Sequence, residues 1–217
     1  MLTKALVWAA MERAGLIRYD AHIAMGNGMH TKVYASFIPA LMTREQIDWV
    51  VDQLRPTTYP FASLEPDERA IVGIGCGGNF ATLLAYHLGI PWAYAEEGRG
   101  GVLQLNRNQG QMIAGREIMI VDDVFVSGST IRKLAALVEQ HGGKPNRIGV
   151  ILNRTETNLK EFDYNGACLR FDTIFHHPMP TYPDREHCVS CKAGIPLSTE
   201  HGAGAEQVFM HGQPQRV

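Results

Sequence analysis

An acidic pair followed by a hydroxyl-rich turn is the segment of this sequence whose residue types are best suited to chemistry. The apolar run Ile118–Val121 ends in Asp122 and Asp123, and after three spacers comes the turn Ser127–Thr130, with a helical pattern from Ile131. Backbone N–H groups of such a turn, together with a helix N-terminus, bind phosphate. Carboxylates bind sugar hydroxyls or a metal ion. We interpret the segment as a candidate sugar-phosphate site, the alternative being a strand end with two solvated acids.

A glycine-rich turn lies one strand–helix unit earlier in the chain. The apolar strand Ile71–Gly75 leads into Cys76-Gly-Gly-Asn79, and helical spacing runs from Phe80 to Leu88. Glycine alone is weak evidence for a binding site, because many tight strand-to-helix turns require it. The turn is stronger evidence for a binding site because it lies one strand–helix unit before the acidic strand.

Predicted strands and helices alternate along the chain, and each of the two turns joins a strand to the helix that follows it. Strands are predicted at 71–75, 90–95, 117–121, 147–152 and 167–171, and helices at 43–54, 80–88 and 131–141. Segments 102–104 and 111–114 are predicted as a hairpin or a mobile loop. Such alternation indicates an α/β fold with a mostly parallel sheet flanked by helices. Sites in these sheets lie outside the carboxyl ends of the strands, where both turns fall.

The length of 217 residues fits a single domain, 1–217. We predict a core over about 67–174 and a small cap, or hood, formed by 17–66 together with 175–200. A disordered tail is predicted for 205–217, where periodicity is absent.

Composition excludes several classes of protein. The net charge of -2 leaves no basic surface for nucleic acid. No apolar run approaches the ~20 residues that span a membrane, and residues 1–16 have the spacing of an amphipathic helix rather than of a signal peptide. Four cysteines do not make a disulfide framework. These features predict a reducing, cytoplasmic location.

The acidic strand and its turn together resemble the phosphoribosyl-diphosphate (PRPP) signature of type I phosphoribosyltransferases. The resemblance implies that Asp122 and Asp123 face the ribose and that Mg²⁺ binds through PRPP oxygens, with no metal held by the protein alone. It also implies a 5′-phosphate site at Val126, Ser127, Gly128, Ser129 and Thr130, and a diphosphate site at Gly75, Cys76, Gly77 and Gly78. The family usually has threonine where Ser127 stands, and serine keeps the hydroxyl donor.

Further segments resemble the orotate phosphoribosyltransferase branch. Residues 94–110 resemble its flexible loop, but the loop lysine is absent, so Arg99 and Arg107 would cover the leaving diphosphate. Residues 20–34 resemble its base-binding segment with substitutions between Asn27 and Lys32. The resemblance implies base contacts from His30, Tyr34 and Arg154.

The C-terminal segment contains a Cys-x-x-Cys pair, Cys188 and Cys191, followed by Gly-Ile-Pro-Leu. Such a pair indicates half of a zinc site or a redox pair. His176, His177 and His187 are the candidate partners for a zinc site. The segment resembles the tail of one bacterial and archaeal group of orotate phosphoribosyltransferases, which implies a structural role.

The resemblance implies an enzyme, a pentosyltransferase that joins a nucleobase, orotate above all, to the ribose of PRPP. The products would be orotidine 5′-phosphate and diphosphate in pyrimidine nucleotide biosynthesis, and the enzyme would act as a homodimer. Alternatives are a transferase for another base, a non-catalytic PRPP-binding regulator, and a zinc-binding module built on the cysteine tail.

Overall fold

The computed structural model describes residues 2–25, 28–55, 61–98 and 101–198. The chain divides into two compact units. The first comprises Met1–Val7 and Phe37–Pro178, and the second comprises Trp8–Ser36 and Met179–Val217. Helix α1 (Lys4–Arg13) begins in the first unit and ends in the second.

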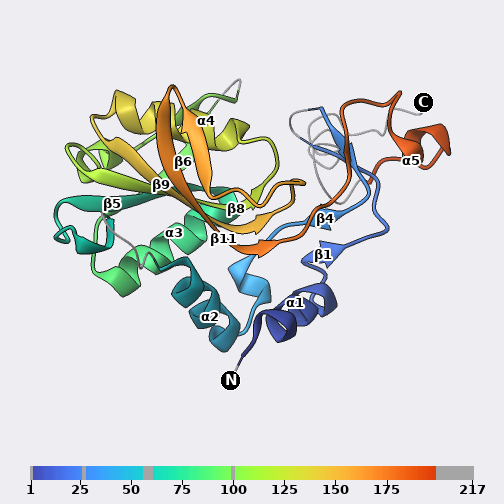
Figure 1. Cartoon of the computed structure of the whole chain (residues 1–217), viewed down its shortest axis with the longest axis horizontal. Helices are drawn as coiled ribbons and strands as arrows, with labels where there is room; N and C mark the ends of the chain where they lie inside the picture. Colours follow the sequence, from blue (N-terminus) through green and yellow to red (C-terminus); the bar gives the residue numbers. More distant parts are fainter. Residues whose placement is uncertain (1, 26–27, 56–60, 99–100, 199–217) are drawn as a thin grey trace. The chain divides into compact units, whose positions relative to one another are not determined.

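A seven-stranded sheet forms the first unit in the part of the chain that the structure describes (Figure 1). The strand order is β10-β11-β9-β8-β5-β6-β7. The five inner strands are parallel, and the two edge strands are antiparallel to their neighbours. The strands are β5 (Arg69–Ile74), β6 (Trp92–Glu97), β7 (Leu103–Gln104), β8 (Glu117–Phe125), β9 (Lys144–Asn153), β10 (Glu161–Tyr164) and β11 (Ala167–His176).

The connections reverse direction between β5 and β8. From β5 the chain crosses by helix α3 (Gly75–Leu88) to β6 on one side. From β8 it crosses by helix α4 (Ser129–Gln140) to β9 on the other side. The crevice at the carboxyl ends of β5 and β8 is therefore the topological switch point, where open α/β sheets bind ligands.

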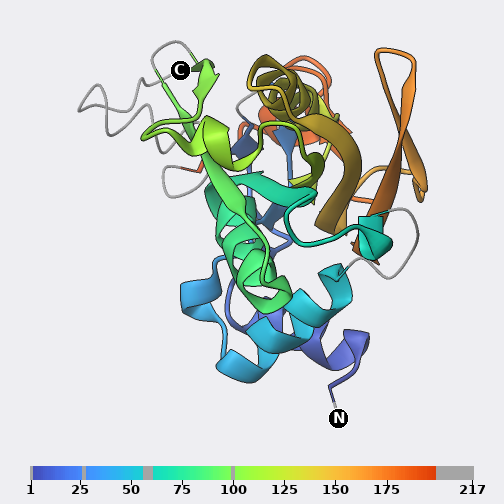
Figure 2. The same cartoon turned by 90° about the vertical axis from the view of Figure 1, so that its left-hand side faces the viewer.

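Helices cover both faces of the sheet, with α3 and α2 (Arg44–Leu54) on one face and α4 on the other (Figures 1 and 2). Thr43 caps α2 through a capping box with Gln46, which confirms the predicted helix start. The apolar face of α2 buries Val50, Val51 and Leu54, and this helix contacts α3, β9 and β11. Short 3₁₀ helices occupy Pro39–Leu41, Phe61–Ser63 and Gln109–Met112.

Apolar packing beneath α4 fixes the end of the acidic strand. Phe125, the last residue of β8, packs edge-to-face on Phe162 and Phe171, with ring centroids 5.8 and 4.8 Å apart. Each buried aromatic ring of this kind contributes about 1.5–3 kcal/mol. The buried face of α4, with Ile131 and Leu134, belongs to the same cluster. The carboxyl end of β8 is therefore fixed in place by the packing of Phe125 in this apolar cluster.

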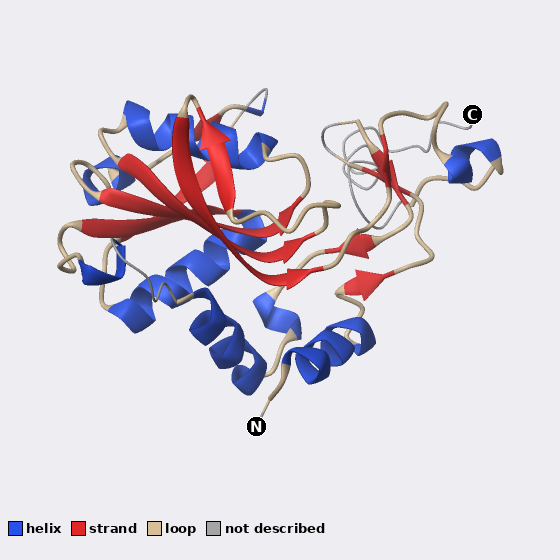
Figure 3. Ribbon diagram, in the orientation of Figure 1, coloured by secondary structure: helices blue, strands red, loops and turns tan. Residues whose placement is uncertain are grey.

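The second unit is built from very short strands (Figure 3). One antiparallel pair joins β1 (Ile17–Arg18) to β4 (Tyr34–Ala35). A three-stranded sheet has the order β12-β3-β2, from Thr181–Tyr182, His30–Thr31 and Ile23–Ala24. The pairing of β12 with β3 joins the C-terminal segment to the N-terminal one, and helix α5 (Val189–Lys192) follows.

The α/β architecture with a mostly parallel sheet is confirmed, while several element boundaries differ from the sequence prediction. Strand β8 extends beyond Val121 to Phe125 because Asp122 to Phe125 continue the ladder with β9. Helix α3 begins at Gly75 rather than Phe80, so the glycine turn is its first turn. Residues 37–66, which we expected in the cap, group with the sheet unit because α2 packs there.

The predicted tail, 205–217, lies outside the described residues. Within the described ranges, no helix has the length and apolar character needed to cross a membrane.

Candidate active site

The first turn of α3 lies directly against the acidic strand. A Cβ atom on Gly77 would lie 2.5 Å from the Cα of Asp122 and 2.9 Å from the backbone nitrogen of Asp123. Only glycine allows this approach without moving one of the two elements. The N–H groups at the start of α3 are consequently held next to β8.

The turn after β8 places a second helix N-terminus at the same edge of the sheet. Gly128, the N-cap of α4, has a left-handed φ of +79°, and a Cβ there would meet the Phe162 ring at 2.6 Å. The Oγ atoms of Ser127 and Ser129 lie 3.3 Å apart in this exposed turn. The turn therefore presents hydroxyl groups next to a helix N-terminus.

Both helix N-termini are suited to anions. Within the described residues, neither α3 nor α4 has a side-chain cap or an acid in its first turn. The first N–H groups of a helix have no partner within it, and they carry the positive end of the helix dipole. Two helix N-termini of a kind that suits anions therefore lie at the carboxyl ends of the adjacent strands β5 and β8.

The acids between these helices are anchored by backbone groups. The Asp123 N–H donates to Asp122 Oδ1 at 2.9 Å, and the Phe37 N–H donates to Asp123 Oδ2 at 3.1 Å. Burial, followed by the charge of Asp123, raises the pKa of Asp122 well above its ordinary value. Burial also raises the pKa of Asp123, opposed by N–H donors that include Phe37. The pair is therefore poised for a ligand that supplies hydroxyl donors or positive charge.

Arg154 follows the last residue of β9 at the same edge. Its backbone N–H donates to the carbonyl of Phe125 at 3.2 Å, next to the end of the acidic strand. The side chain is 4% exposed, and burial lowers its pKa to about 10. The guanidinium remains charged at neutral pH, so Arg154 is a buried cation beside the switch point.

Tyr94 connects the glycine turn to the segment predicted as a lid. Its hydroxyl donates to the carbonyl of Gly75 at 3.1 Å, and its backbone N–H donates to Gln109 Oε1 at 2.6 Å. Strand β7 pairs with β6, whereas 109–112 forms a 3₁₀ helix rather than a second hairpin strand. Arg107 is exposed with a φ of +55°, and Arg99 lies outside the described residues.

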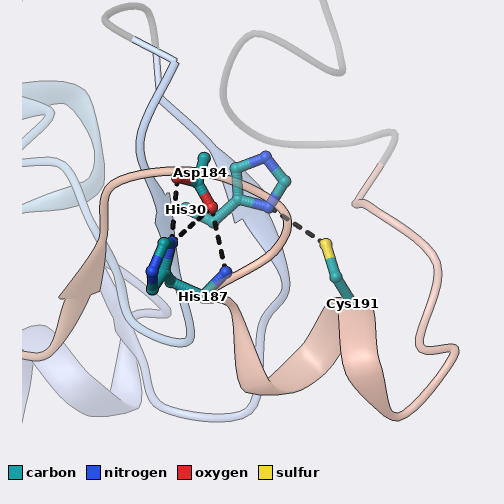
Figure 4. A network of polar contacts seen from close by, with 4 residues as sticks. All are labelled: His30, Asp184, His187 and Cys191. Atoms are coloured by element: carbon teal, nitrogen blue, oxygen red, sulfur yellow. Dashed lines mark hydrogen bonds and ion pairs between the residues drawn. The ribbon is translucent and has the colours of Figure 1, made fainter.

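The predicted base contacts fall in both units. Arg154 lies in the sheet unit, while His30 in β3 and Tyr34 in β4 lie in the second unit. The His30 Nδ1 atom is 3.3 Å from the Cys191 sulfur (Figure 4). It is also 3.2 Å from His22 Nε2. His30 therefore belongs to a cluster of side chains that sequence reasoning did not assemble.

The histidines proposed as partners for the cysteines lie elsewhere. His187 Nδ1 is 2.8 Å from an oxygen of Asp184, and His176 Nε2 is 2.9 Å from the carbonyl of Thr155. The backbone N–H of His177 donates to the carbonyl of Asn153. His22 and His30 contact the cysteines instead, which corrects the candidate set. Sequence proximity favoured the three C-terminal histidines, and no local signal marks His22.

Two curated relatives of this chain are orotate phosphoribosyltransferases. No family model matches the chain. It is 24% identical over 196 residues to the orotate phosphoribosyltransferase of Thermotoga maritima, covering 89% of this chain and 96% of that protein. It is 28% identical over 148 residues to the orotate phosphoribosyltransferase of Pyrobaculum islandicum, covering 65% of this chain and 71% of that protein.

Solved structures share the fold. The orotate phosphoribosyltransferase of Aeropyrum pernix superposes with a TM-score of 0.55 at 17% identity, covering 79% of this chain and 93% of that one. The adenine phosphoribosyltransferase of Trypanosoma brucei, in complex with AMP, pyrophosphate and ribose-5-phosphate, superposes with a TM-score of 0.53 at 14% identity, covering 96% and 87%.

The fold is therefore that of the type I phosphoribosyltransferases. Within that class, the sequence relatives reported above are orotate phosphoribosyltransferases, so the resemblance of this chain to the orotate branch is confirmed.

Proposed function

We propose that this chain transfers the phosphoribosyl group of PRPP to a nucleobase, with orotate as the acceptor and orotidine 5′-phosphate and diphosphate as the products. The observation that carries the proposal is the pair of helix N-termini, of α3 and α4, on either side of Asp122 and Asp123 at the switch point. PRPP has the matching order of groups: a phosphate, a ribose with two hydroxyls, and a diphosphate.

Each part of the site then has a defined task. The turn Val126–Thr130 and the start of α4 hold the 5′-phosphate, and the first turn of α3 holds the diphosphate. The carboxyl groups of Asp122 and Asp123 accept hydrogen bonds from the ribose hydroxyls. These fixed contacts orient the sugar while positive charge develops at its anomeric carbon, so the protein contributes positioning and electrostatic stabilisation.

A magnesium ion fits this set of groups as a partner of the substrate. Mg²⁺ is usually held by one or two carboxylates together with substrate phosphates. Asp123 is half-buried, and its Oδ2 already accepts the Phe37 N–H, so the acids offer the ion few oxygens of their own. Mg²⁺ would bind mainly through PRPP oxygens, with Asp122 and Asp123 nearby, and would neutralise the diphosphate as it leaves.

Arg154 supports orotate as the base. Orotate carries a carboxylate on its ring, and a buried guanidinium that stays charged at neutral pH complements it. Adenine lacks such a group. The names of the sequence relatives point the same way. The base contacts predicted from the sequence for Tyr34 and His30 stay predictions, because both residues belong to the second unit.

A second candidate function is PRPP binding without catalysis. The segment 94–110 contains no lysine, and in the family that the sequence resembles this loop lysine helps to cover the diphosphate. Arg99 and Arg107 are the cations available in the segment, and we propose that Arg99 takes the place of the lysine. A cytoplasmic location and a homodimer remain predictions from the sequence.

The test is PRPP-dependent consumption of orotate, measured with a panel of other bases and with Arg99→Ala. We expect turnover with orotate and a large loss in the variant. Turnover only with another base would contradict the orotate assignment. PRPP binding measured by calorimetry without diphosphate release for any base would favour the regulatory alternative.

A further inference from the structure

We propose that His22, His30, Cys188 and Cys191 form a structural zinc site in the second unit. Each residue offers one ligand atom, and the four atoms all lie within 4.8 Å of one another. Three of the residues are buried, and Cys191 is half-buried. Two thiols and two imidazoles are a set of ligands that zinc binds in structural sites.

The separations of the ligand atoms match a zinc tetrahedron. With zinc–nitrogen bonds of about 2.0 Å and zinc–sulfur bonds of about 2.3 Å, tetrahedral geometry places nitrogens about 3.3 Å apart and nitrogen and sulfur about 3.5 Å apart. His22 Nε2 and His30 Nδ1 are separated by 3.2 Å. The sulfurs of Cys188 and Cys191 lie 3.5 and 3.4 Å from His22 Nε2, and Cys191 Sγ lies 3.3 Å from His30 Nδ1. All four values agree with a shared central ion.

Hydrogen bonding alone does not account for the cluster. The Nδ1 atom of His22 is 2.7 Å from the carbonyl of Ile195, so Nδ1 carries the proton and neutral His22 has its lone pair on Nε2. That one lone pair faces three neighbours, namely both sulfurs and His30 Nδ1. A metal ion satisfies all of them at once. The bond to Ile195 is also the outer hydrogen bond that metal-bound histidines usually make.

Two local elements build the site. In the β2–β3 hairpin, Ala24 lies opposite His30, and His22 shares the face of Ala24 because side chains alternate along a strand. Cys188 is the N-cap of α5, and Cys191 is its third residue. Figure 4 shows the side chains of His30 and Cys191 pointing toward each other. The proposed ion would join the hairpin to the C-terminal helix.

The site has the character of a structural one. Four protein ligands leave no open coordination position for a substrate. Among the described residues of the second unit, each strand has two residues and few apolar side chains are buried. These are Met11, Leu16, Ile17, Ile23, Val33 and Met179. Small units with so little core are commonly stabilised by a metal. As a zinc ligand, His30 would not be free to contact a base.

The first experiment measures metals in the full chain, purified under reducing conditions without chelators. We expect about one zinc per chain by inductively coupled plasma mass spectrometry. Cobalt exchanged into the site should give the visible absorption of tetrahedral thiolate-bound Co²⁺. A chain that lacks zinc and takes up no cobalt would overturn the proposal. So would a Cys188–Cys191 disulfide found by mass spectrometry, or iron in place of zinc.

Matched variants locate the site. Cys191→Ser and His22→Gln should lose most of the zinc, while Cys168→Ser and His187→Gln should keep it, because these two residues lie outside the cluster. Equal loss in all four variants would contradict the assignment. If Cys191→Ser fails to fold, the cobalt spectrum of the unaltered chain still decides the question. Removing zinc from that chain should lower the melting temperature by roughly 10 °C.

Discussion

Gly77 in α3 packs against the backbone of Asp122 in β8, so that a Cβ atom at position 77 would lie 2.5 Å from the Cα of Asp122. This contact joins the two halves of the proposed PRPP site. The diphosphate-binding turn and the ribose-binding acids therefore keep their relative positions through a backbone contact, and a side chain at position 77 would separate them.

Gly77→Ala should weaken both stability and PRPP binding. The added methyl group meets backbone atoms that cannot rotate away, and overpacking of this kind costs about 1–3 kcal/mol. We expect a melting temperature lower by roughly 2–4 °C for each kcal/mol, together with reduced PRPP affinity in calorimetry. Asn79→Ala, at an exposed position in the same helix, is the control. Unchanged PRPP affinity in Gly77→Ala would count against a diphosphate site at this turn.

Ser127→Ala should weaken PRPP binding without unfolding the chain. Ser127 is exposed, so its hydroxyl contributes little to the folded state, whereas a hydrogen bond to a charged phosphate is worth about 1.5–3 kcal/mol. We expect an affinity at least 10-fold lower and an unchanged melting temperature. Ser127→Thr keeps the hydroxyl and should bind normally. Equal binding by the alanine and threonine variants would argue against a phosphate contact at position 127.

Asp122→Asn should stabilise the ligand-free chain in a pH-dependent way. Burial raises the pKa of Asp122 in the folded state, so the fold favours the protonated carboxyl group. The stability that this preference contributes is fully present below the unfolded-state pKa. This effect is lost as the pH rises through the folded-state pKa. Asparagine cannot ionise, and its side-chain oxygen can still accept the Asp123 N–H.

The melting-temperature difference between Asp122→Asn and the unaltered chain should therefore be small near pH 4 and grow toward neutral pH. Asp67→Asn, at an exposed site, is the matched control and should show no such trend. A constant difference for Asp122→Asn across this range would show that ionisation of Asp122 carries no cost. PRPP affinity should fall in the same variant because a ribose contact changes.

Arg154→Met should separate base recognition from PRPP binding. Loss of a charged hydrogen bond to the base should lower kcat/KM for orotate by roughly 10- to 100-fold. PRPP affinity should change little, because Arg154 lies outside the proposed phosphate and ribose contacts. The exposed Arg170→Met provides the comparison for steady-state kinetics. A loss confined to PRPP affinity would move Arg154 out of the base site.

Local patterns were sufficient for much of the sheet unit. The apolar strands, the Thr43 cap and the helix after Ser127–Thr130 were predicted because each depends on neighbouring residues. The limits of these elements were harder to predict. Strand β8 runs to Phe125 because its partner strand continues there, and α3 begins at Gly75 because Gly77 fits against β8. Both features depend on contacts between distant segments.

The sequence by itself determined the α/β class and the order of chemical groups along it: glycine turn, acidic pair and hydroxyl-rich turn. Only the tertiary structure decided which residues meet. The carboxylate of Asp123 accepts a hydrogen bond from the backbone N–H of Phe37, 86 residues away. The Cys188 sulfur lies 3.5 Å from Nε2 of His22, 166 residues away, whereas the side chain of the neighbouring His187 contacts Asp184. Periodicity and turn chemistry report on neighbouring residues only. Contacts between distant residues depend on how the strands pair, as in the pairing of β12 in the C-terminal segment with β3.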